Sequence, residues 1–151
     1  MTGITQSSTQ ISPTARTAGI IGALAIAAAL VGNGLALLVG TLAGADMEVL
    51  QPGASEPVEV GIAMVATMTV GPLLLGTIAL LVAARWGARA WPKVWQALAW
   101  LGLAIGILTV FMPFTVEAGT DTRLTLASMH VTTGVVWFVA LRRTPAGALS
   151  S

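Results

Sequence analysis

Apolar and polar residues form long alternating blocks along this chain. Four blocks are apolar enough and long enough to cross a bilayer as helices, since one span needs about 20 predominantly apolar residues. They cover residues 17–42, 58–84, 92–114 and 124–141. Their only charged residues are Glu59 and Lys93, each close to an end of its block. The pattern predicts four transmembrane helices joined by short polar segments.

The blocks lack the two-residue alternation of membrane β-strands, which excludes a transmembrane barrel. The predicted fold class is therefore all-α, an integral membrane four-helix bundle over residues 17–143. Residues 1–16 and 144–151 are polar and are predicted to be disordered cytoplasmic tails. The first apolar block is about twice the length of a signal-peptide core, which favours a retained helix over a cleaved signal.

Charged residues separate between the two ends of the predicted helices. Six of the seven basic residues lie at one end, namely Arg16, Arg85, Arg89, Lys93, Arg142 and Arg143. All six acidic residues lie at the other end with Arg123, namely Asp46, Glu48, Glu56, Glu59, Glu117 and Asp121. The positive-inside rule then places both termini in the cytoplasm. We expect a multi-pass protein of the bacterial plasma (inner) membrane.

Composition limits the partners and cofactors. The chain is 56% hydrophobic and 9% charged, too few charges to cover a globular surface in water, so the lipid bilayer is the expected surroundings. A net charge of +1 without a basic stripe argues against nucleic acid. With no cysteine and one histidine, neither a thiolate site nor a bis-histidine haem is possible within the chain, and a zinc site would need carboxylates. No metal and no cofactor are predicted.

The ends of the helices carry further signals. Pro57 and Pro92 stand where a first helical turn is expected, the position that proline tolerates best. Segment 43–57 is the longest loop and is predicted to cap the bundle or to lie at the membrane interface. Four tryptophans map to the basic end, where an aromatic belt is expected. They are Trp86, Trp91, Trp95 and Trp137, with Trp100 somewhat deeper.

Small residues predict where the helices pack. Gly22 and Ala29 belong to a stripe on the first span, and Gly102 and Gly106 form a GxxxG pair on the third. Packing within one four-helix bundle is the favoured interpretation, and a homo-oligomer interface is the alternative. Pro72 interrupts the second span, where it removes a backbone donor and predicts a kink. One interpretation is that the kink only improves helix packing. The other is that it forms a hinge or the wall of a cavity.

Polar side chains gather at one depth of the predicted bundle. His130 and Asn33 lie in the acidic-side half of their spans, together with Thr67, Thr109 and Thr133. An unpaired amide or imidazole in hydrocarbon costs several kcal/mol, so both should face the bundle interior. One interpretation is a closed layer of interhelical hydrogen bonds. The other is an outward-facing cavity in which His130 is a protonatable or ligand-binding group.

Catalytic patterns are missing from the sequence. It has no HExxH, no glycine-rich phosphate loop and no paired carboxylates within the spans. Ser128 lies two residues before His130, which points the two side chains to different faces of a helix. The protein is therefore predicted not to be an enzyme and to have no catalytic residues.

Four segments together resemble a known family. They are LVGNGLALLVG, LLVAARWGARAW, LTVFMPFTVEAGT and LTLASMHVTTGVV. They resemble the actinobacterial four-span membrane proteins of domain-of-unknown-function family 6069, over nearly the whole chain apart from the tails. Asn33, Pro113, Met129 and His130 match the family, and Thr109 stands where serine is often found. The family has no established activity, so the resemblance implies topology and an actinobacterial source and adds weight to Asn33 and His130.

Two functional hypotheses follow. The first is a small multi-pass membrane protein without catalytic activity, an accessory or assembly partner for a membrane protein, with the polar layer as internal glue. The alternative is a small-solute or proton-coupled carrier, or a binder of a lipophilic ligand, with an outward-facing polar cavity around His130 and Asn33. No small-molecule ligand can be named from the sequence.

Overall fold

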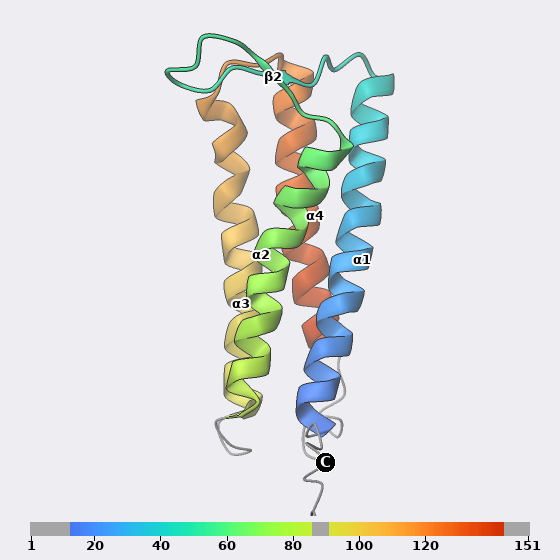
Figure 1. Ribbon diagram of the computed structural model, residues 1–151, viewed down its shortest axis with the longest axis vertical. Helices are drawn as coiled ribbons and strands as arrows, with labels where there is room; N and C mark the ends of the chain where they lie inside the picture. Colours follow the sequence, from blue (N-terminus) through green and yellow to red (C-terminus); the bar gives the residue numbers. More distant parts are fainter. Residues whose placement is uncertain (1–12, 86–90, 144–151) are drawn as a thin grey trace, which may run out of the picture.

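The computed structural model describes residues 13–85 and 91–143, which form an all-helical bundle with a small hairpin at one end (Figure 1). The helices are α1 (Pro13–Leu42), α2 (Ile62–Ala83), α3 (Trp91–Leu108) and α4 (Thr120–Arg142). A 3₁₀ segment, η1 (Thr109–Thr115), continues α3, and the hairpin consists of β1 (Glu48–Val49) and β2 (Val58–Glu59). All four helices, α3 with η1 included, are long and apolar enough to cross a membrane, which confirms the predicted helical class.

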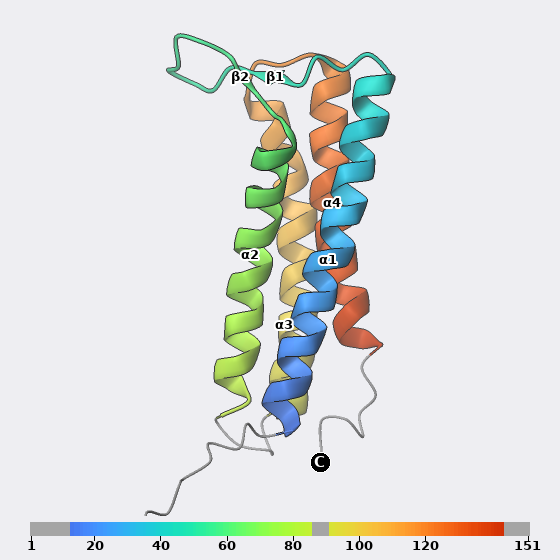
Figure 2. The same ribbon diagram turned by 45° about the vertical axis from the view of Figure 1, so that its right-hand side comes forward.

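The helices stand side by side and connect alternately at two ends (Figures 1 and 2). We call the end with β1 and β2 the hairpin end; the other, where α1 begins and α4 finishes, is the opposite end. α1 packs along both α2 and α4, and α4 packs along α3, whereas α2 and α3 are neighbours with much less contact. α4 is therefore the helix that joins the two halves of the bundle.

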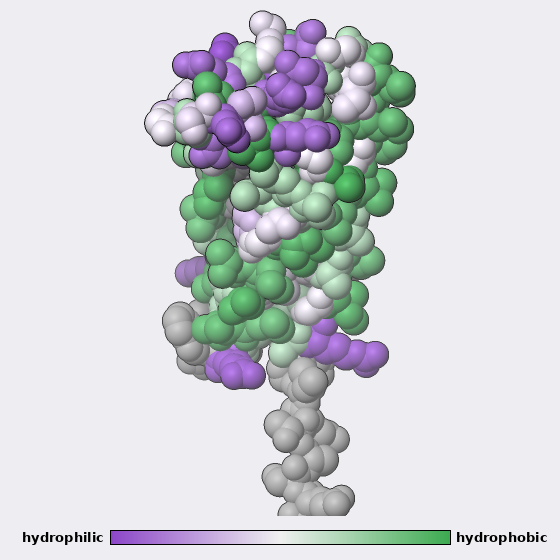
Figure 3. Space-filling view, turned by 45° about the horizontal axis from the view of Figure 1, so that its top comes forward, coloured by the Kyte–Doolittle hydropathy of each residue, from purple (hydrophilic) through white to green (hydrophobic). Residues whose placement is uncertain are grey.

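The outside of the bundle is apolar between two polar ends (Figure 3). Large apolar side chains such as Leu38, Leu75 and Phe111 are exposed along the helices. Exposed side chains of this kind are costly in water and ordinary in hydrocarbon. The four apolar helices and their apolar surface indicate a membrane protein.

Glycines bring the helices into close contact. A Cβ added to Gly106 would lie 2.7 Å from the Cα of Gly134, so α3 and α4 meet backbone to backbone. Gly22 lies against the side chain of Thr77, and Ala29 is fully buried. These packing positions are thus occupied by other helices of the same chain, and they do not need a second copy to cover them.

The tryptophan prediction was wrong for two residues. Trp95 and Trp137 are each only 4% exposed and lie inside the bundle, whereas Trp100 is 52% exposed. The indole of Trp137 fits between Gly76 of α2 and Gly102 of α3, where any side chain would occupy its place. Gly76 and Gly102 thus leave a notch between α2 and α3, and the indole of Trp137 is buried in this notch. The side chains of Trp86 and Trp91 lie outside the described residues.

The second helix begins later than predicted. Residues 58–59 form β2 rather than helix, and α2 begins at Ile62. Val49 pairs with Val58 and Glu48 with Glu59 in an antiparallel register, and the Val60 amide donates to the Met47 carbonyl at 2.8 Å. Pro57, Glu56 and Glu59 thus belong to the hairpin and not to a helix start. Because Val58 and Val60 are apolar, hydropathy alone extended the helix into this strand.

The other boundaries differ less. α1 begins at Pro13, four residues before the predicted position 17, so residues 13–16 are helical and not tail. The rest of the predicted tails, 1–12 and 144–151, lies outside the described residues. α2 continues through Pro72, whose side chain is exposed on the outer face of the bundle.

Candidate functional site

Asn33 is the centre of a hydrogen-bonded polar layer between three helices. Its side chain is 2% exposed, and its Nδ2 donates to the hydroxyl of Thr69 on α2 at 2.8 Å and to that of Thr133 on α4 at 3.0 Å. The two hydroxyls donate in turn to carbonyls of their own helices, Thr69 to Val65 and Thr133 to Met129. One amide group therefore links α1, α2 and α4 at membrane depth.

The Oδ1 atom of Asn33 is buried and has no hydrogen-bond partner within the described part of the chain. Reversing the amide would not remove the deficit, because the same position would then hold an unpartnered N–H. An unsatisfied buried acceptor costs about 1–3 kcal/mol. The Nδ2 atom of Asn33 thus makes two hydrogen bonds, whereas its Oδ1 atom could still accept one from a further donor.

Apolar clusters enclose this layer from both ends. Towards the opposite end lie Ala25, Ala29, Leu73, Trp137 and other buried residues. Towards the hairpin end lie Met47, Val49, Val60, Val65 and Met129. Apolar surroundings have a low dielectric constant, which strengthens the two hydrogen bonds that Asn33 donates.

The other predicted site residues lie outside this layer of hydrogen bonds. The hydroxyl of Thr109 donates to the Ile105 carbonyl of its own helix at 2.8 Å. Thr67 is exposed and likewise bonds within α2. His130 is half-buried, one turn before Gly134, and its ring makes no hydrogen bond to any described residue. Of the predicted residues, the structure brings together Asn33 and Thr133 and joins Thr69 to them.

A second polar cluster fixes the hairpin to the start of α4. Thr122 is fully buried and donates to Oδ1 of Asp46 at 2.7 Å, while the amide of Met47 donates to the Thr122 hydroxyl at 3.2 Å. The Glu48 amide donates to the same Asp46 oxygen at 3.2 Å. Met47 adopts a φ of 56°, in the left-handed region that is uncommon for a side-chain-bearing residue. This turn aims the Asp46 carboxylate at α4.

Main-chain pairing completes the attachment of the hairpin. Leu50 and Glu117 exchange amide-to-carbonyl bonds of 2.8 and 3.1 Å, so an isolated antiparallel bridge joins the segment before α4 to the residue that follows β1. We call residues 45–60, held in this way, the cap. Sequence reasoning missed Asp46 and Thr122 because they are 76 positions apart and no local motif connects them.

Two hollows of the described chain lie away from Asn33 and His130. One, of about 160 Å³, lies under the hairpin turn beside Glu117 and Pro52. The other, of about 280 Å³, is an open groove between α1 and α4 near Gly40 and Asp121. Among the described residues no group of three His, Asp or Glu side chains is placed to hold a metal ion.

Comparison with known proteins assigns the family. The model of the family of unknown function DUF6069 matches residues 13–147, which include every described helix. The chain belongs to this family. No curated protein and no solved structure matches the chain. Membership therefore agrees with the resemblance seen in the sequence, and it brings no activity with it.

We expect the two threonines of α2 to respond differently to loss of their hydroxyl. Thr69→Val removes an acceptor of Asn33 and should lower the free energy of unfolding by about 0.6–2 kcal/mol, the range of interhelical hydrogen bonds in membranes. Thr67→Val is the matched control, since its exposed hydroxyl bonds only within its own helix. Unfolding by sodium dodecyl sulfate, followed by circular dichroism, measures both. Equal losses for the two variants would contradict the interhelical role of Thr69.

The attachment of the cap should weaken in acid. The hydrogen bond from Thr122, followed by that from the Glu48 amide, holds the pKa of Asp46 below its ordinary value. A carboxyl whose pKa is lowered by folding stabilises the fold above its ordinary pKa of about 3.9, and this contribution disappears as the pH falls through the lowered value. Hydrogen-exchange protection of the Met47 and Glu48 amides should therefore fall at acid pH. Asp46→Asn should remove that dependence, and an unchanged acid response in this variant would assign it to another group.

Proposed function

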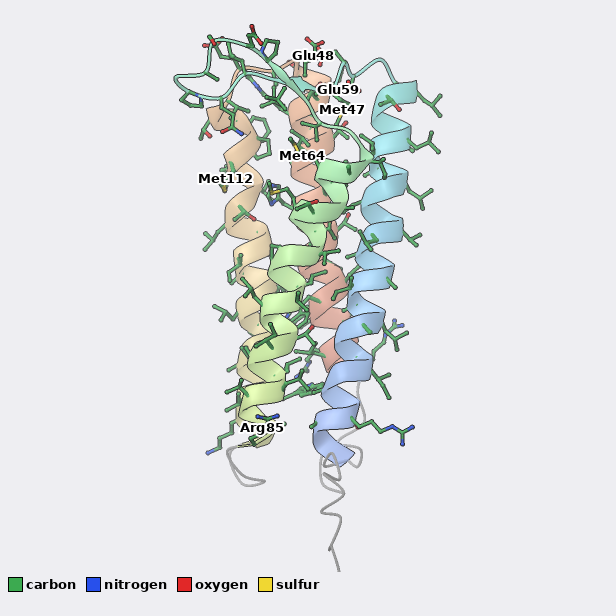
Figure 4. The ribbon with its side chains drawn as sticks, in the orientation of Figure 1. Met47, Glu48, Glu59, Met64, Arg85 and Met112 are labelled. Atoms are coloured by element: carbon green, nitrogen blue, oxygen red, sulfur yellow. The ribbon has the colours of Figure 1, made fainter. Side chains whose placement is uncertain are left out.

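We propose that the chain is a non-catalytic multi-pass protein of the bacterial plasma membrane that acts as an accessory or assembly partner. Its termini are cytoplasmic and its cap faces outside. Support for the orientation comes from charge: Arg16, Arg85, Lys93, Arg142 and Arg143 lie at the opposite end, while the acidic residues lie at the hairpin end. Figure 4 places Glu48 and Glu59 at the hairpin end and Arg85 at the other. This separation follows the positive-inside rule.

The Glu48–Glu59 pair is the observation that carries the proposed role. These residues are directly opposite in the β1–β2 register, so their side chains share one face of the hairpin, and both are exposed. Like charges in such a pair destabilise the hairpin. No basic side chain among the described residues forms an ion pair with either carboxylate. A basic segment of another membrane protein would remove this repulsion.

The rest of the bundle suits a rigid support for such a contact. Asp46, Thr122 and the Leu50–Glu117 pairing fix the cap to the helices, and backbone contact at Gly106 and Gly134 fixes the helices to one another. A preorganised surface loses little conformational entropy when it binds. The role of the Asn33 layer in this proposal is to hold three helices together.

Co-purification tests the proposed role. The full chain is extracted in mild detergent and the proteins bound to it are identified by mass spectrometry. We expect a partner that the double variant Glu48→Gln, Glu59→Gln loses and that the control Glu56→Gln keeps, because Glu56 is exposed on the same hairpin outside the pair. Equal recovery with the double variant, or a chain that purifies alone, would overturn the proposal.

Cysteine labelling tests the orientation separately. The chain has no cysteine, so one introduced thiol reports without background. Ser55→Cys on the hairpin should react with a membrane-impermeant maleimide in intact cells. Arg85→Cys should react only after the cells are opened. The reverse result would place the cap in the cytoplasm.

The unpartnered Asn33 oxygen favours a second candidate, a small-solute or proton-coupled carrier or a binder of a lipophilic ligand. In such a protein this acceptor and His130 would receive a polar group from the solute or ligand. His130→Gln separates the two candidates: an accessory protein should change only in stability, whereas a carrier should lose a pH-dependent flux in reconstituted vesicles. A variant that folds and shows no change in any flux would eliminate the carrier.

A further inference from the structure

A groove runs along the surface between α1 and α4, in the half of the bundle nearest the hairpin end. Its volume is about 280 Å³, and it is open to the side. Ala36 of α1, Ala43 just after the end of α1, and Leu124 of α4 form its apolar walls, and Gly40 and Thr125 lie between them. Asp121, an exposed residue in the first turn of α4, lines the rim of the groove.

The shape of the groove selects its occupant. Ala36 and Ala43 are seven residues apart, and the Ala43 amide still donates to the Val39 carbonyl in a helical turn, which gives the groove a length of about 10 Å. At its floor, the side chain of Thr125 fills the space where a Cβ of Gly40 would lie, so α1 and α4 are already in contact there. A transmembrane helix, about 10–12 Å wide with its side chains, cannot enter between them. A single acyl chain can lie along such a groove in the hydrocarbon region.

The charge at the rim selects the head group. The Asp121 side chain has no oppositely charged partner among the described residues, and its helix end offers only a partial positive charge. The surrounding hairpin end carries all six acidic residues of the chain and a single arginine. An anionic lipid such as phosphatidylglycerol is repelled by this field, whereas a lipid with a terminal ammonium group is attracted by Asp121.

We propose that the α1–α4 groove binds a phosphatidylethanolamine-type lipid, with one acyl chain against Ala36 and Ala43 and its ammonium group at Asp121. The site goes beyond the proposed accessory role and does not depend on which side of the membrane the cap faces. The lipid fills the groove on the outer side of the α1–α4 contact and supplies a positive charge, which none of the residues lining the groove carries. It thereby holds α1 and α4 together where the cap joins them.

Native mass spectrometry of the full chain tests the site. The protein is stripped of lipid in mild detergent and offered equal amounts of phosphatidylethanolamine and phosphatidylglycerol with identical acyl chains. We expect the chain to retain phosphatidylethanolamine in preference. Asp121→Asn should reduce that preference by up to about fivefold, the upper ratio expected of a solvent-exposed ion pair. Glu56→Gln, which removes an equal charge from the hairpin away from the groove, should leave it unchanged.

Two further variants separate lipid binding in the groove from background binding elsewhere on the protein. Ala43→Phe fills the groove from its exposed wall and should abolish the preferred binding, with the secondary structure checked by circular dichroism. Arg85→Gln at the opposite end should lower only the background binding of phosphatidylglycerol. Equal retention of the two lipids by the wild type, or a preference that Asp121→Asn does not alter, would overturn the proposal. So would a wild-type dimer that Ala43→Phe dissociates, since a second copy would then cover the groove.

Discussion

Replacing Trp137 by alanine should destabilise the bundle more than any other single truncation that we consider. The indole is 4% exposed, fills the notch left by Gly76 and Gly102, and donates from Nε1 to the Leu98 carbonyl at 2.9 Å. Its loss leaves a cavity between three helices and removes the bond to the Leu98 carbonyl. We expect the free energy of unfolding to fall by about 3–5 kcal/mol. Titration with sodium dodecyl sulfate, followed by far-ultraviolet circular dichroism, measures the change.

Trp100→Ala is the matched control for this prediction. Trp100 is 52% exposed on the outer face of α3, and its ring centroid lies 4.6 Å from that of Phe138. The contact of one exposed ring pair is worth about 0.5–1.5 kcal/mol, so this variant should lose far less stability. A loss at Trp100 as large as that at Trp137 would show that both indoles act through the membrane interface and not through the notch.

A single added methyl group at Gly106 should have the second-largest effect. The new Cβ would lie 2.7 Å from the Cα of Gly134 and 3.0 Å from the His130 carbonyl oxygen, and neither backbone atom can rotate away. Gly106→Ala must therefore move α3 and α4 apart, at a cost of about 1–3 kcal/mol typical of overpacked cores. Gly134→Ala should act in the same direction, because its Cβ would meet the Cα of Gly106 at 3.0 Å.

Gly34→Ala provides the control for added volume. No atom lies within 4 Å of a Cβ at this position of α1, so the variant meets open space. Alanine is more favourable than glycine inside a helix by about 0.5–1 kcal/mol, and Gly34→Ala should be neutral or stabilising. Thermal melting of both variants in the same detergent compares them. A stable Gly106→Ala protein would mean that the two helices do not touch in the membrane.

The fold was predictable because hydropathy and helix length depend on local sequence. The four apolar blocks correspond to the four helices, but α1 and α4 begin four residues earlier than predicted and α2 begins four residues later. Val58 looks like the start of a helix, yet it pairs with Val49 in a short strand, and the neighbouring Leu50 pairs with Glu117. A pairing between residues as distant in the sequence as Leu50 and Glu117 leaves no periodic pattern of hydropathy in either segment.

The sequence predicts at which depth of the bundle the site residues lie, but not which of their side chains are in contact. The positions of Asn33 and Thr133 along their helices placed them in one layer, since each residue advances a helix by about 1.5 Å. Rotation decided the rest: Thr69 faces Asn33, while Thr67, two residues earlier, is exposed. The burial of Trp137 also depends on glycines of two other helices. None of these facing relations can be obtained from one helix at a time.

The two buried tryptophans of α3 and α4 bond in opposite directions. Trp95 of α3 donates to the Leu141 carbonyl of α4 at 2.9 Å, and Trp137 of α4 donates to the Leu98 carbonyl of α3 at the same distance. Sliding either helix along the other by one residue would break both bonds at once, so α3 and α4 are locked in register as one body. A change in the relative positions of the helices must then occur outside the contact between α3 and α4. Of the four pairs of neighbouring helices, α2 and α3 have the least contact, so a movement that separates these two breaks the fewest interactions.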